Sequence, residues 1–509
     1  MTKKEEALPM APVKGQKPEE EHPEWKHEVT LGEESKPKVR MPESKVEEQK
    51  IELRKMEQGP ILKNPRMLYL IAYKMEKNGY IGELENKLNI FLVGTTKDYK
   101  RRHRMGIVIG GESGVGKSWL LKIFETYFPE DVVSISRMTA HAPDYMEGMF
   151  SGGTCDGKIL LIKQIEGAED SGPAIMIMLD PVSGGLRLLT VEDKKIKERV
   201  LKGMPVIGTS SVRVSFDPQI IRRFLDIHPD DSPEQTARIM EHDAKLEEDP
   251  EYEKNCETVD SDIKEIVGTM KLESSKFGVE NPFASFIPPK IPKVILARTD
   301  ILKVFGMIVA VTHLFYQDRF HFTNKFGTET LIASPADYYL AWRIVGKTIT
   351  KRLSGISDDR ITILIKALEK IDPKKEGVSA EDIHKAVPQY QMSTIYEGMG
   401  ELRNQGYSTT EKNPKDERKR VYKRTGKALT PIDIVFPDKQ IEETYIKFVK
   451  EHFGKLDEES GKKHALSAEE TDLLRKSLIV CDIATGRNIT KEVISEETFK
   501  EYNLGDVSV

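Results

Sequence analysis

Short apolar runs alternate with helix-length amphipathic segments through the first half of this chain. Amphipathic spacing predicts a helix over residues 65–75, and an ordered segment at 80–94 leads toward the first strand. Short apolar runs predict strands at 107–109, 132–136, 159–162 and 205–209. Strands that alternate with helices form parallel sheets covered by helices, because parallel neighbours need crossover connections. An α/β domain is therefore expected here.

Changes in composition divide the rest of the chain. Lys, Glu and Pro dominate the N-terminus, which cannot bury enough apolar surface to offset its chain entropy. A serine cap at Ser379 opens one short helix, Gly406 ends a second, and a basic hairpin follows, which is the outline of a winged helix. We predict a disordered charged arm (1–58), the α/β core (59–232), an acidic helical connection (233–292), a helical lid (293–371), a winged-helix module (372–427) and a helical tail (428–509).

Composition adds limits rather than a function. The 509 residues are 38% hydrophobic and 32% charged with a net charge of −5, so a nucleic-acid partner would have to bind local basic patches. Three cysteines without a C-x-x-C pair favour a reducing compartment and no zinc ribbon. Without a signal peptide or a membrane-spanning run, we expect a cytoplasmic protein with no membrane partner.

The most specific motif follows the strand at 107–109. Gly111, Gly116, Lys117 and Ser118 fit G-x-x-x-x-G-K-[ST], and an apolar-periodic helix follows. Backbone N–H groups of such a loop surround a phosphate, Lys117 reaches the β and γ oxygens, and Ser118 holds Mg²⁺. A chance glycine-rich turn is the alternative. The predicted nucleotide-binding residues are Gly111, Glu112, Ser113, Gly114, Val115, Gly116, Lys117, Ser118 and Trp119.

The strand at 159–162 stands where an acidic pair usually supports the metal, but Lys163 and Gln164 follow it. Strand alternation puts Gln164 and Glu166 on one face, so Gln164 is expected to bind a metal-coordinated water and Glu166 to polarise the attacking one. Glu169 and Asp170 are substitutes if the strand ends early. The alternative is a weakened hydrolytic site, because an amide is a poor replacement for a carboxylate.

Two further segments complete the predicted site. Thr209 or Ser210, at the end of the strand at 205–209, is expected to sense the γ-phosphate. Arg222 and Arg223 end a helix predicted over 217–225, and one of them would enter a neighbouring subunit's site as an arginine finger. Such a finger implies a ring, whereas a solvated basic helix end is the alternative.

Basic residues gather on two predicted hairpins. Residues 184–202 predict two strands joined near 192–195, with Lys194 and Lys195 at the tip and Arg187, Lys197 and Arg199 along the sides, a pattern that fits a grip on a nucleic-acid backbone. A surface hairpin without a function is the alternative. The second hairpin is the wing, where Arg418, Lys419 and Arg420 would hold duplex phosphates, unless the module docks a protein.

Taken in order, these segments resemble the minichromosome-maintenance-like AAA+ ATPases of archaeal and bacterial mobile elements, a group often encoded near primases. The residues that look like its markers are Gly-Glu-Ser-Gly-Val-Gly-Lys-Ser at 111–118, Arg137-Met-Thr139, Ile165-Glu-Gly-Ala-Glu169 and Ser-Pro-Glu-Gln-Thr-Ala-Arg at 232–238. The resemblance covers about residues 60–425. It implies a hexameric ring that uses ATP and Mg²⁺, with single-stranded DNA in its pore and a primase or polymerase as a further partner. Lys163-Gln164 departs from the pattern, and the second-sensor arginine has only Arg343 and Arg352 as candidates.

From these features we expect an ATP-driven DNA helicase or translocase acting in replication of a mobile element. The alternative is a DNA-bound AAA+ switch, an initiator or loader that binds ATP without sustained unwinding. A metabolic P-loop kinase ranks third, because it explains neither the arginine pair nor the winged module.

Overall fold

The computed structural model describes residues 60–138, 142–150, 153–164, 172–192, 195–211, 222–354, 359–372, 377–388, 390–404, 406–413, 416–425, 434–455 and 465–506. Within these ranges, some side chains are not described. The predicted arm at 1–58 lies outside it entirely.

A five-stranded parallel sheet organises the first part of the chain. Its strands are β1 (Gly106–Gly110), β2 (Val132–Ile135), β3 (Ile159–Ile162), β6 (Val206–Ser211) and β7 (Phe224–Ile227), in the spatial order β2-β3-β6-β1-β7. Helices and loops cover both faces of β1, β3 and β6, so β3 and the middle of β1 are continuous apolar runs, and β6 is buried throughout although it ends in Thr and Ser residues. The strands predicted from the sequence are confirmed by their pairing in this sheet.

β7 is the strand that the sequence pattern missed. The helix predicted over 217–225 is wrong at its C-terminal end, because Arg222 and Arg223 form a turn and Phe224 begins a strand that pairs with β1. Residues 212–221 lie outside the described part of the chain. Four residues with one polar position are too few to show a strand period by themselves.

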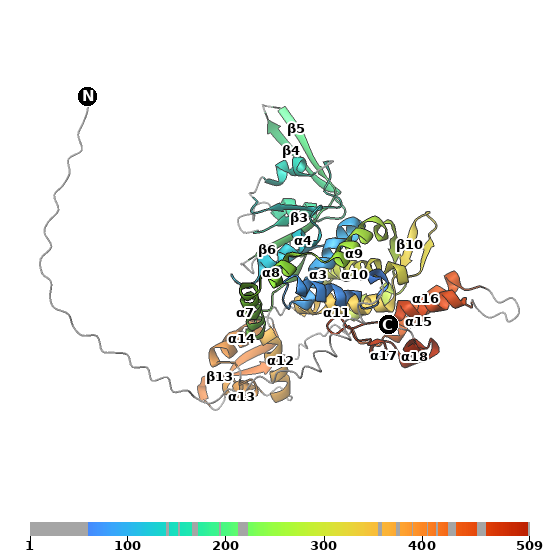
Figure 1. The fold of residues 1–509 in the computed structure, drawn as a ribbon. Helices are drawn as coiled ribbons and strands as arrows, with labels where there is room; N and C mark the ends of the chain where they lie inside the picture. The colour runs from blue at the N-terminus through green and yellow to red at the C-terminus, as the bar shows by residue number, and fades with distance from the viewer. Residues whose placement is uncertain are drawn as a thin grey trace, which may run out of the picture. The chain divides into compact units, whose positions relative to one another are not determined.

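Two elements between β3 and β6 lie outside the sheet. Helix α5 (Gly172–Met178) precedes an antiparallel hairpin of β4 (Gly185–Glu192) and β5 (Lys195–Lys202), whose last pair is Glu192 with Lys195. This confirms the hairpin predicted at 184–202. The hairpin extends beyond the edge of the sheet (Figure 1).

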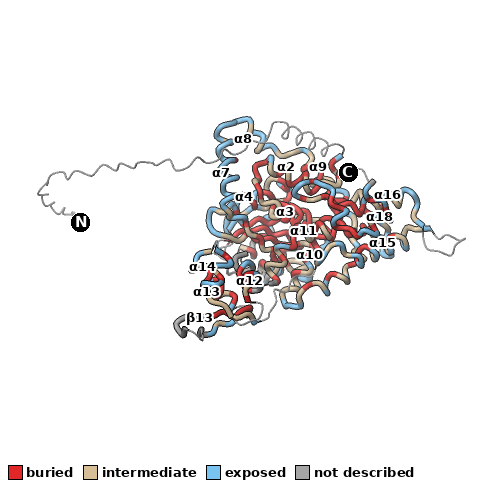
Figure 2. The backbone as a smooth tube through the Cα atoms, turned by 90° about the horizontal axis from the view of Figure 1, so that it is seen from below, coloured by how far each residue is buried: buried red, intermediate tan, exposed pale blue. Residues whose placement is uncertain are grey.

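A large helical core lies against the sheet. It includes α2 (Met67–Lys77), α3 (Leu84–Thr95), α4 (Lys117–Tyr127), α9 (Ser261–Leu272), α10 (Ala297–Leu314) and α11 (Pro335–Ser354). Buried residues concentrate in α2, α3, α10 and α11, whereas α7 (Pro233–Glu248) and α8 (Pro250–Glu257) are mostly exposed (Figure 2). Between α9 and α11, a small mixed sheet joins β8 (Gly278–Glu280), β10 (Glu329–Ile332) and β9 (His321–Thr323).

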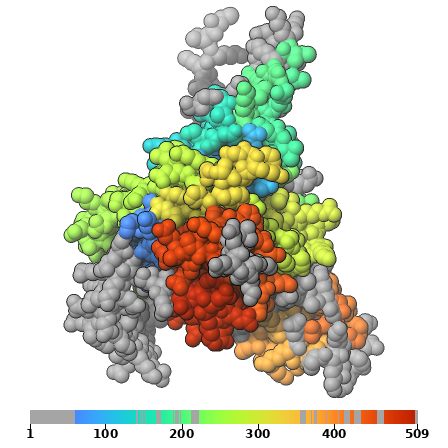
Figure 3. Space-filling model, turned by 90° about the vertical axis from the view of Figure 1, so that its right-hand side faces the viewer, coloured from blue at the N-terminus to red at the C-terminus, as the bar shows by residue number. Residues whose placement is uncertain are grey.

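The C-terminal segment belongs to this same core. Its helices are α15 (Lys439–Phe453), α16 (Ala468–Leu478), α17 (Thr490–Val493) and α18 (Glu496–Glu501). Tyr445 is fully buried, and the Phe453 ring lies 4.8 Å from the Phe320 ring. The C-terminal residues, red in Figure 3, pack directly against the yellow residues around β9 and β10.

A smaller core holds the elements around the expected winged helix. These are α12 (Asp359–Ile371), β11 (Val378–Ser379), α13 (Ala380–Ala386), α14 (Met392–Asn404), β12 (Ser408–Asn413) and β13 (Asp416–Arg424), with the strands ordered β11-β13-β12. Ser379 caps α13 in a capping box with Asp382. Leu364 and Leu368 of α12 pack in this core, so the compact unit includes residues before the predicted boundary at 372.

Candidate nucleotide-binding site

The glycine-rich loop joins β1, which lies between β6 and β7 in the sheet, to helix α4. Gly114 and Gly116 have φ angles of 91° and 89°, and a Cβ on either would meet no atom within 4 Å, so glycine is needed there for conformation rather than for space. α4 begins at Lys117 without a side-chain cap. Its first N–H groups have no partner within the helix, which makes this end a site for an anion.

Lys117 is directed back over the loop. Its side chain is buried, and Nζ donates to the carbonyl oxygens of Gly111, at 2.7 Å, and Glu112. Ser118 follows on the exposed side of the first helical turn. Trp119 is half exposed beside it, and its Nε1 donates to the Gly79 carbonyl at 3.0 Å. Lys117 and Ser118, which are expected to contact phosphate and Mg²⁺, therefore both lie at the N-terminal end of α4.

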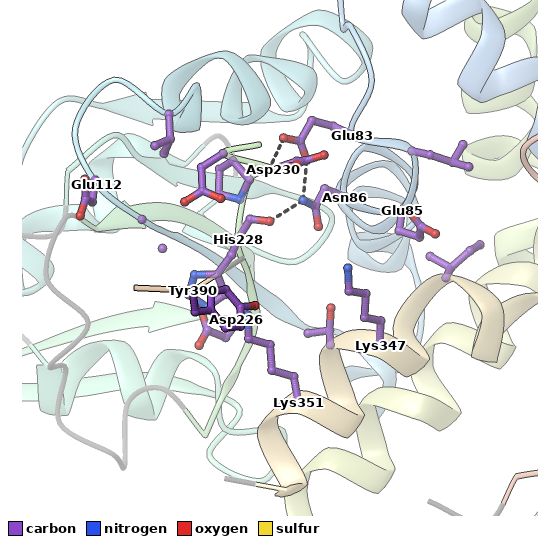
Figure 4. A pocket seen from close by; sticks show the side chains of 18 residues that line it. Glu83, Glu85, Asn86, Glu112, Asp226, His228, Asp230, Lys347, Lys351 and Tyr390 are labelled. Atoms are coloured by element: carbon purple, nitrogen blue, oxygen red, sulfur yellow. Dashed lines mark hydrogen bonds and ion pairs between the residues drawn. The ribbon is translucent and has the colours of Figure 1, made fainter. Parts of the chain in front are cut away.

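A cavity of about 770 Å³ opens beside the loop. Four other segments line it: the start of α3, the end of β7 with the residues that follow it, one face of α11, and Tyr390 (Figure 4). Among the described residues, its charged side chains include Asp226 and Asp230 on one side and Lys347 and Lys351 on α11. Its walls are more polar than apolar, and its size suits a small polar ligand.

Hydrogen bonds tie the start of α3 to the segment after β7. Glu83 accepts from the Asp230 N–H at 2.6 Å and from Asn86 Nδ2 at 2.6 Å, and Asn86 also donates to the His228 carbonyl at 2.7 Å (Figure 4). Burial raises the pKa of Glu83, against the lowering effect of these donors. This wall of the cavity is thus fixed by the protein's own contacts.

The cations that face the cavity differ from those expected. Arg343 pairs with Glu85 at 2.8 Å, and Arg352 is directed away from the cavity toward Asp300. Lys347 and Lys351 line the cavity instead, four residues apart on one face of α11. Their spacing puts both lysines on one face of the helix, but the sequence alone does not show that this face lines a cavity.

At the end of β3, Lys163 and Gln164 are exposed and bonded. Lys163 Nζ lies 3.2 Å from a Glu125 oxygen on α4, and Gln164 Oε1 accepts from Arg137 Nε at 3.3 Å. Glu166, Glu169 and Asp170 lie outside the described residues. No group of three or more His, Cys, Asp and Glu side chains suited to a metal occurs within the described ranges. With Ser118 but no carboxylate at this strand end, the described residues do not by themselves fit a magnesium site.

The end of β6 carries one bonded and one unbonded hydroxyl. Ser210 Oγ donates to the Lys163 carbonyl at 2.6 Å, which locks it between strands. Thr209 is fully buried, and its Oγ1 has no hydrogen-bond partner among the described residues. An unpaired buried hydroxyl is costly, so of these two residues Thr209 is the one with bonding capacity to spare.

The arginine pair lies at the opposite end of β7 from the cavity. Arg223 Nη2 is 3.9 Å from an Asp180 oxygen, and both side chains are about a third exposed. Arg222 Nε is buried and makes no hydrogen bond within the part of the chain that the structure describes. Within the described residues, a single long ion pair, that of Arg223 with Asp180, is thus the contact found for the two arginine side chains' charges.

The predicted DNA contacts are described only in part. On the hairpin, Arg187 is exposed and lies 3.4 Å from Glu198, whereas the side chains of Lys195 and Lys197 and all of Lys194 fall outside the description. On the wing, Arg420 is exposed, and the side chains of Arg418 and Lys419 are not described. The hairpin's base is anchored, since Asp156 bonds Arg104 and, at 3.1 Å, the Met204 N–H.

Comparison with known proteins gives one family match. Residues 52–271 match the family model described as MTBMA_p00010 P-loop domain, which is less than half of the chain. No curated protein matches the chain. Among solved structures, the chain is similar to a full-length MCM homolog from Methanopyrus kandleri, at 13% sequence identity and a TM-score of 0.36. That alignment covers 62% of this chain and 64%, less than two thirds, of the other.

The parallel sheet, the glycine-rich loop after β1 and the family match together define an α/β P-loop domain in this chain. None of the helices in the described ranges is long and apolar enough to cross a membrane.

Proposed function

We propose that this protein is an MCM-like AAA+ ATPase that moves on DNA as a ring. The observation that carries the proposal is the order of functional segments through the sheet. The P-loop follows β1, the basic hairpin immediately precedes β6, and the arginine pair immediately precedes β7. A metabolic kinase would need the first of these features but neither of the others.

ATP is the proposed nucleotide, bound in the cavity between the P-loop and α11. Its phosphates would take the helix N-terminus and Lys117, which would exchange its two loop carbonyls for phosphate oxygens. Lys347 and Lys351 add positive charge from the other side. Thr209, with its unpaired hydroxyl, would contact the γ-phosphate.

Hydrolysis is assigned to residues of two subunits. Glu166 would orient the attacking water with Gln164 beside it, and Arg222 or Arg223 from the neighbour would stabilise the charge that develops on the γ-phosphoryl group. Ser118 is the residue proposed to hold Mg²⁺ against the bound phosphates, although no described carboxylate at the end of β3 would support the metal. The partial exposure of Arg223 and the Arg222 Nε atom, which has no hydrogen-bond partner among the described residues, support a role for the pair in the adjoining subunit.

DNA is the proposed track. The hairpins with Lys194, Lys195, Arg187 and Lys197 would hold one strand in the pore, and the wing would hold duplex phosphates. A hexamer, a mobile-element setting and a primase or polymerase partner belong to the proposal through the family resemblance.

Displacement of a strand from a forked DNA tests the proposal. The full-length protein should release the strand with ATP, and Lys194→Ala/Lys195→Ala should lose this activity. Lys264→Ala, which removes an exposed lysine on α9, is the matched control and should behave as wild type. ATP turnover without any strand release would refute the motor.

One observation favours the alternative, a DNA-bound ATP switch such as an initiator or loader. Lys163, paired with Glu125, stands where a carboxylate usually supports the metal. A switch needs tight binding more than fast turnover, so ATP-dependent DNA binding without strand displacement would be its signature.

A further inference from the structure

A buried cluster of three charges connects the two long helices behind the cavity. Asp300 of α10 is fully buried, and the side chains of Lys303 and Arg352 are 5% and 10% exposed. Lys303 Nζ donates to Asp300 Oδ1 at 2.6 Å, and Arg352 Nε lies 3.0 Å from Asp300 Oδ2. The contact between Arg352 Nε and Asp300 Oδ2 is an ion pair whose geometry does not meet that of a hydrogen bond.

Arg352 also reaches the central sheet. Its Nη1 donates to the Phe224 carbonyl at 3.1 Å. Phe224 is the first residue of β7 and directly follows Arg223. Its ring packs against Gly106 of β1, where an added Cβ would lie 2.7 Å from it. The residue after the arginine pair is therefore held from two sides.

The same cluster adjoins the nucleotide cavity. Lys351, the neighbour of Arg352, lines the cavity, as does Asp226, two residues after Phe224. Burial lowers the pKa of Lys303 to about 8, while the charges of Asp300 and Asp226 act in the opposite direction. A buried carboxylate between two cations is costly to rearrange, since loss of either partner leaves an uncompensated charge.

We infer that Arg352, oriented by Asp300, is a positioning residue for Arg222 and Arg223. Arg352 fixes the start of β7. Helix α11, which lines a subunit's own cavity, therefore also sets the position of the arginines that complete the next subunit's site. The inference rests on the proposed function, in which these arginines complete a neighbour's site.

Mixtures of inactive full-length subunits isolate this role. A Lys117→Ala subunit cannot hydrolyse ATP but still offers its arginines, and an Arg222→Ala/Arg223→Ala subunit retains Lys117 but offers none. Their mixture should recover ATP turnover. The tested subunit is Lys117→Ala/Arg352→Lys, which keeps a cation beside Asp300 and loses the fork that reaches Phe224.

This subunit should recover at least tenfold less turnover, since a misplacement of about 1 Å can cost on the order of a hundredfold. Its thermal midpoint and its entry into mixed rings should match those of Lys117→Ala. Lys117→Ala/Arg343→Lys is the control, because it makes the same change on the same helix at an exposed pair, and it should give full recovery. If Arg352→Lys lowers the thermal midpoint, Asp300→Asn/Lys303→Met/Arg352→Met, which removes all three charges of the cluster, replaces it and should show the same deficit.

Equal recovery with the Arg352 and Arg343 variants would overturn the inference. No recovery by Lys117→Ala itself, with mixed rings demonstrated, would refute the shared site and the inference with it. That failure is recognisable because it occurs without any change at Arg352.

Discussion

Replacing Gly208 with alanine should disturb the contact that holds the P-loop helix on the sheet. Gly208 lies in β6 beneath α4, and an added Cβ would stand 2.6 Å from Phe124 Cε2 and 3.3 Å from Leu161 Cδ1. Phe124 is fully buried on the helix that begins with Lys117. Overpacking costs about 1–3 kcal/mol, and burial of one methyl returns about 0.8 kcal/mol. The 2.6 Å approach is closer than Cβ contacts in proteins, so the upper half of this range applies and a net loss of about 1–2 kcal/mol follows.

Hydrogen exchange measures this loss locally. Amides of α4 should exchange about 5–30-fold faster in Gly208→Ala, the factor that corresponds to 1–2 kcal/mol. Gly268→Ala in α9 is the matched control, because its Cβ would meet nothing within 4 Å and alanine favours a helix over glycine by about 0.5–1 kcal/mol. Unchanged exchange in α4, or an equal effect at Gly268, would refute the packing argument.

Three further predictions concern charge. Lys117→Ala should abolish ATP turnover with an unchanged circular-dichroism spectrum, because the side chain bonds only loop carbonyls; unchanged turnover would exclude this site. Neutralising Arg418, Lys419 and Arg420 should lower the salt dependence of duplex binding, measured by fluorescence anisotropy, by up to about three units of slope; an unchanged slope would favour a protein-docking wing. Burial lowers the pKa of His313 to about 3, whereas an unfolded histidine has a pKa of about 6.5. Between these two pH values the unfolded state binds one proton more than the folded state, so the stabilisation by neutral His313 is complete above pH 6.5 and falls as the pH drops. His313→Phe should therefore reduce the fall of the thermal midpoint over that range by removing up to about 1.4 kcal/mol per pH unit, and an unaltered pH profile would contradict the assignment.

The elements predicted correctly are those whose signal is local. β3 and the middle of β1 are apolar runs that need burial on both faces, β6 begins with Val-Ile, and the P-loop glycines adopt φ values that other residues avoid. The hairpin of β4 and β5 has alternating positions and a short turn. In each case the neighbouring residues alone carry the information.

The misassigned elements depend on distant partners. β7 is a strand because β1 pairs with it, and nothing in Phe224–Ile227 alone requires that. Lys347 and Arg343 both lie on α11, and only the placement of that helix shows that the lysine lines the cavity while the arginine pairs with Glu85. Such facts arise from tertiary packing, which a periodic pattern cannot encode.

ATP turnover measured with and without single-stranded DNA tests the central claim most directly. A ring that grips DNA with its hairpins and shares each site between subunits should hydrolyse ATP faster when DNA is bound. Lys117→Ala should show no turnover in either condition, and Lys194→Ala/Lys195→Ala should retain the basal rate without the acceleration. A wild-type rate that is the same with and without DNA, or a Lys194→Ala/Lys195→Ala rate that still rises with DNA, would contradict the account.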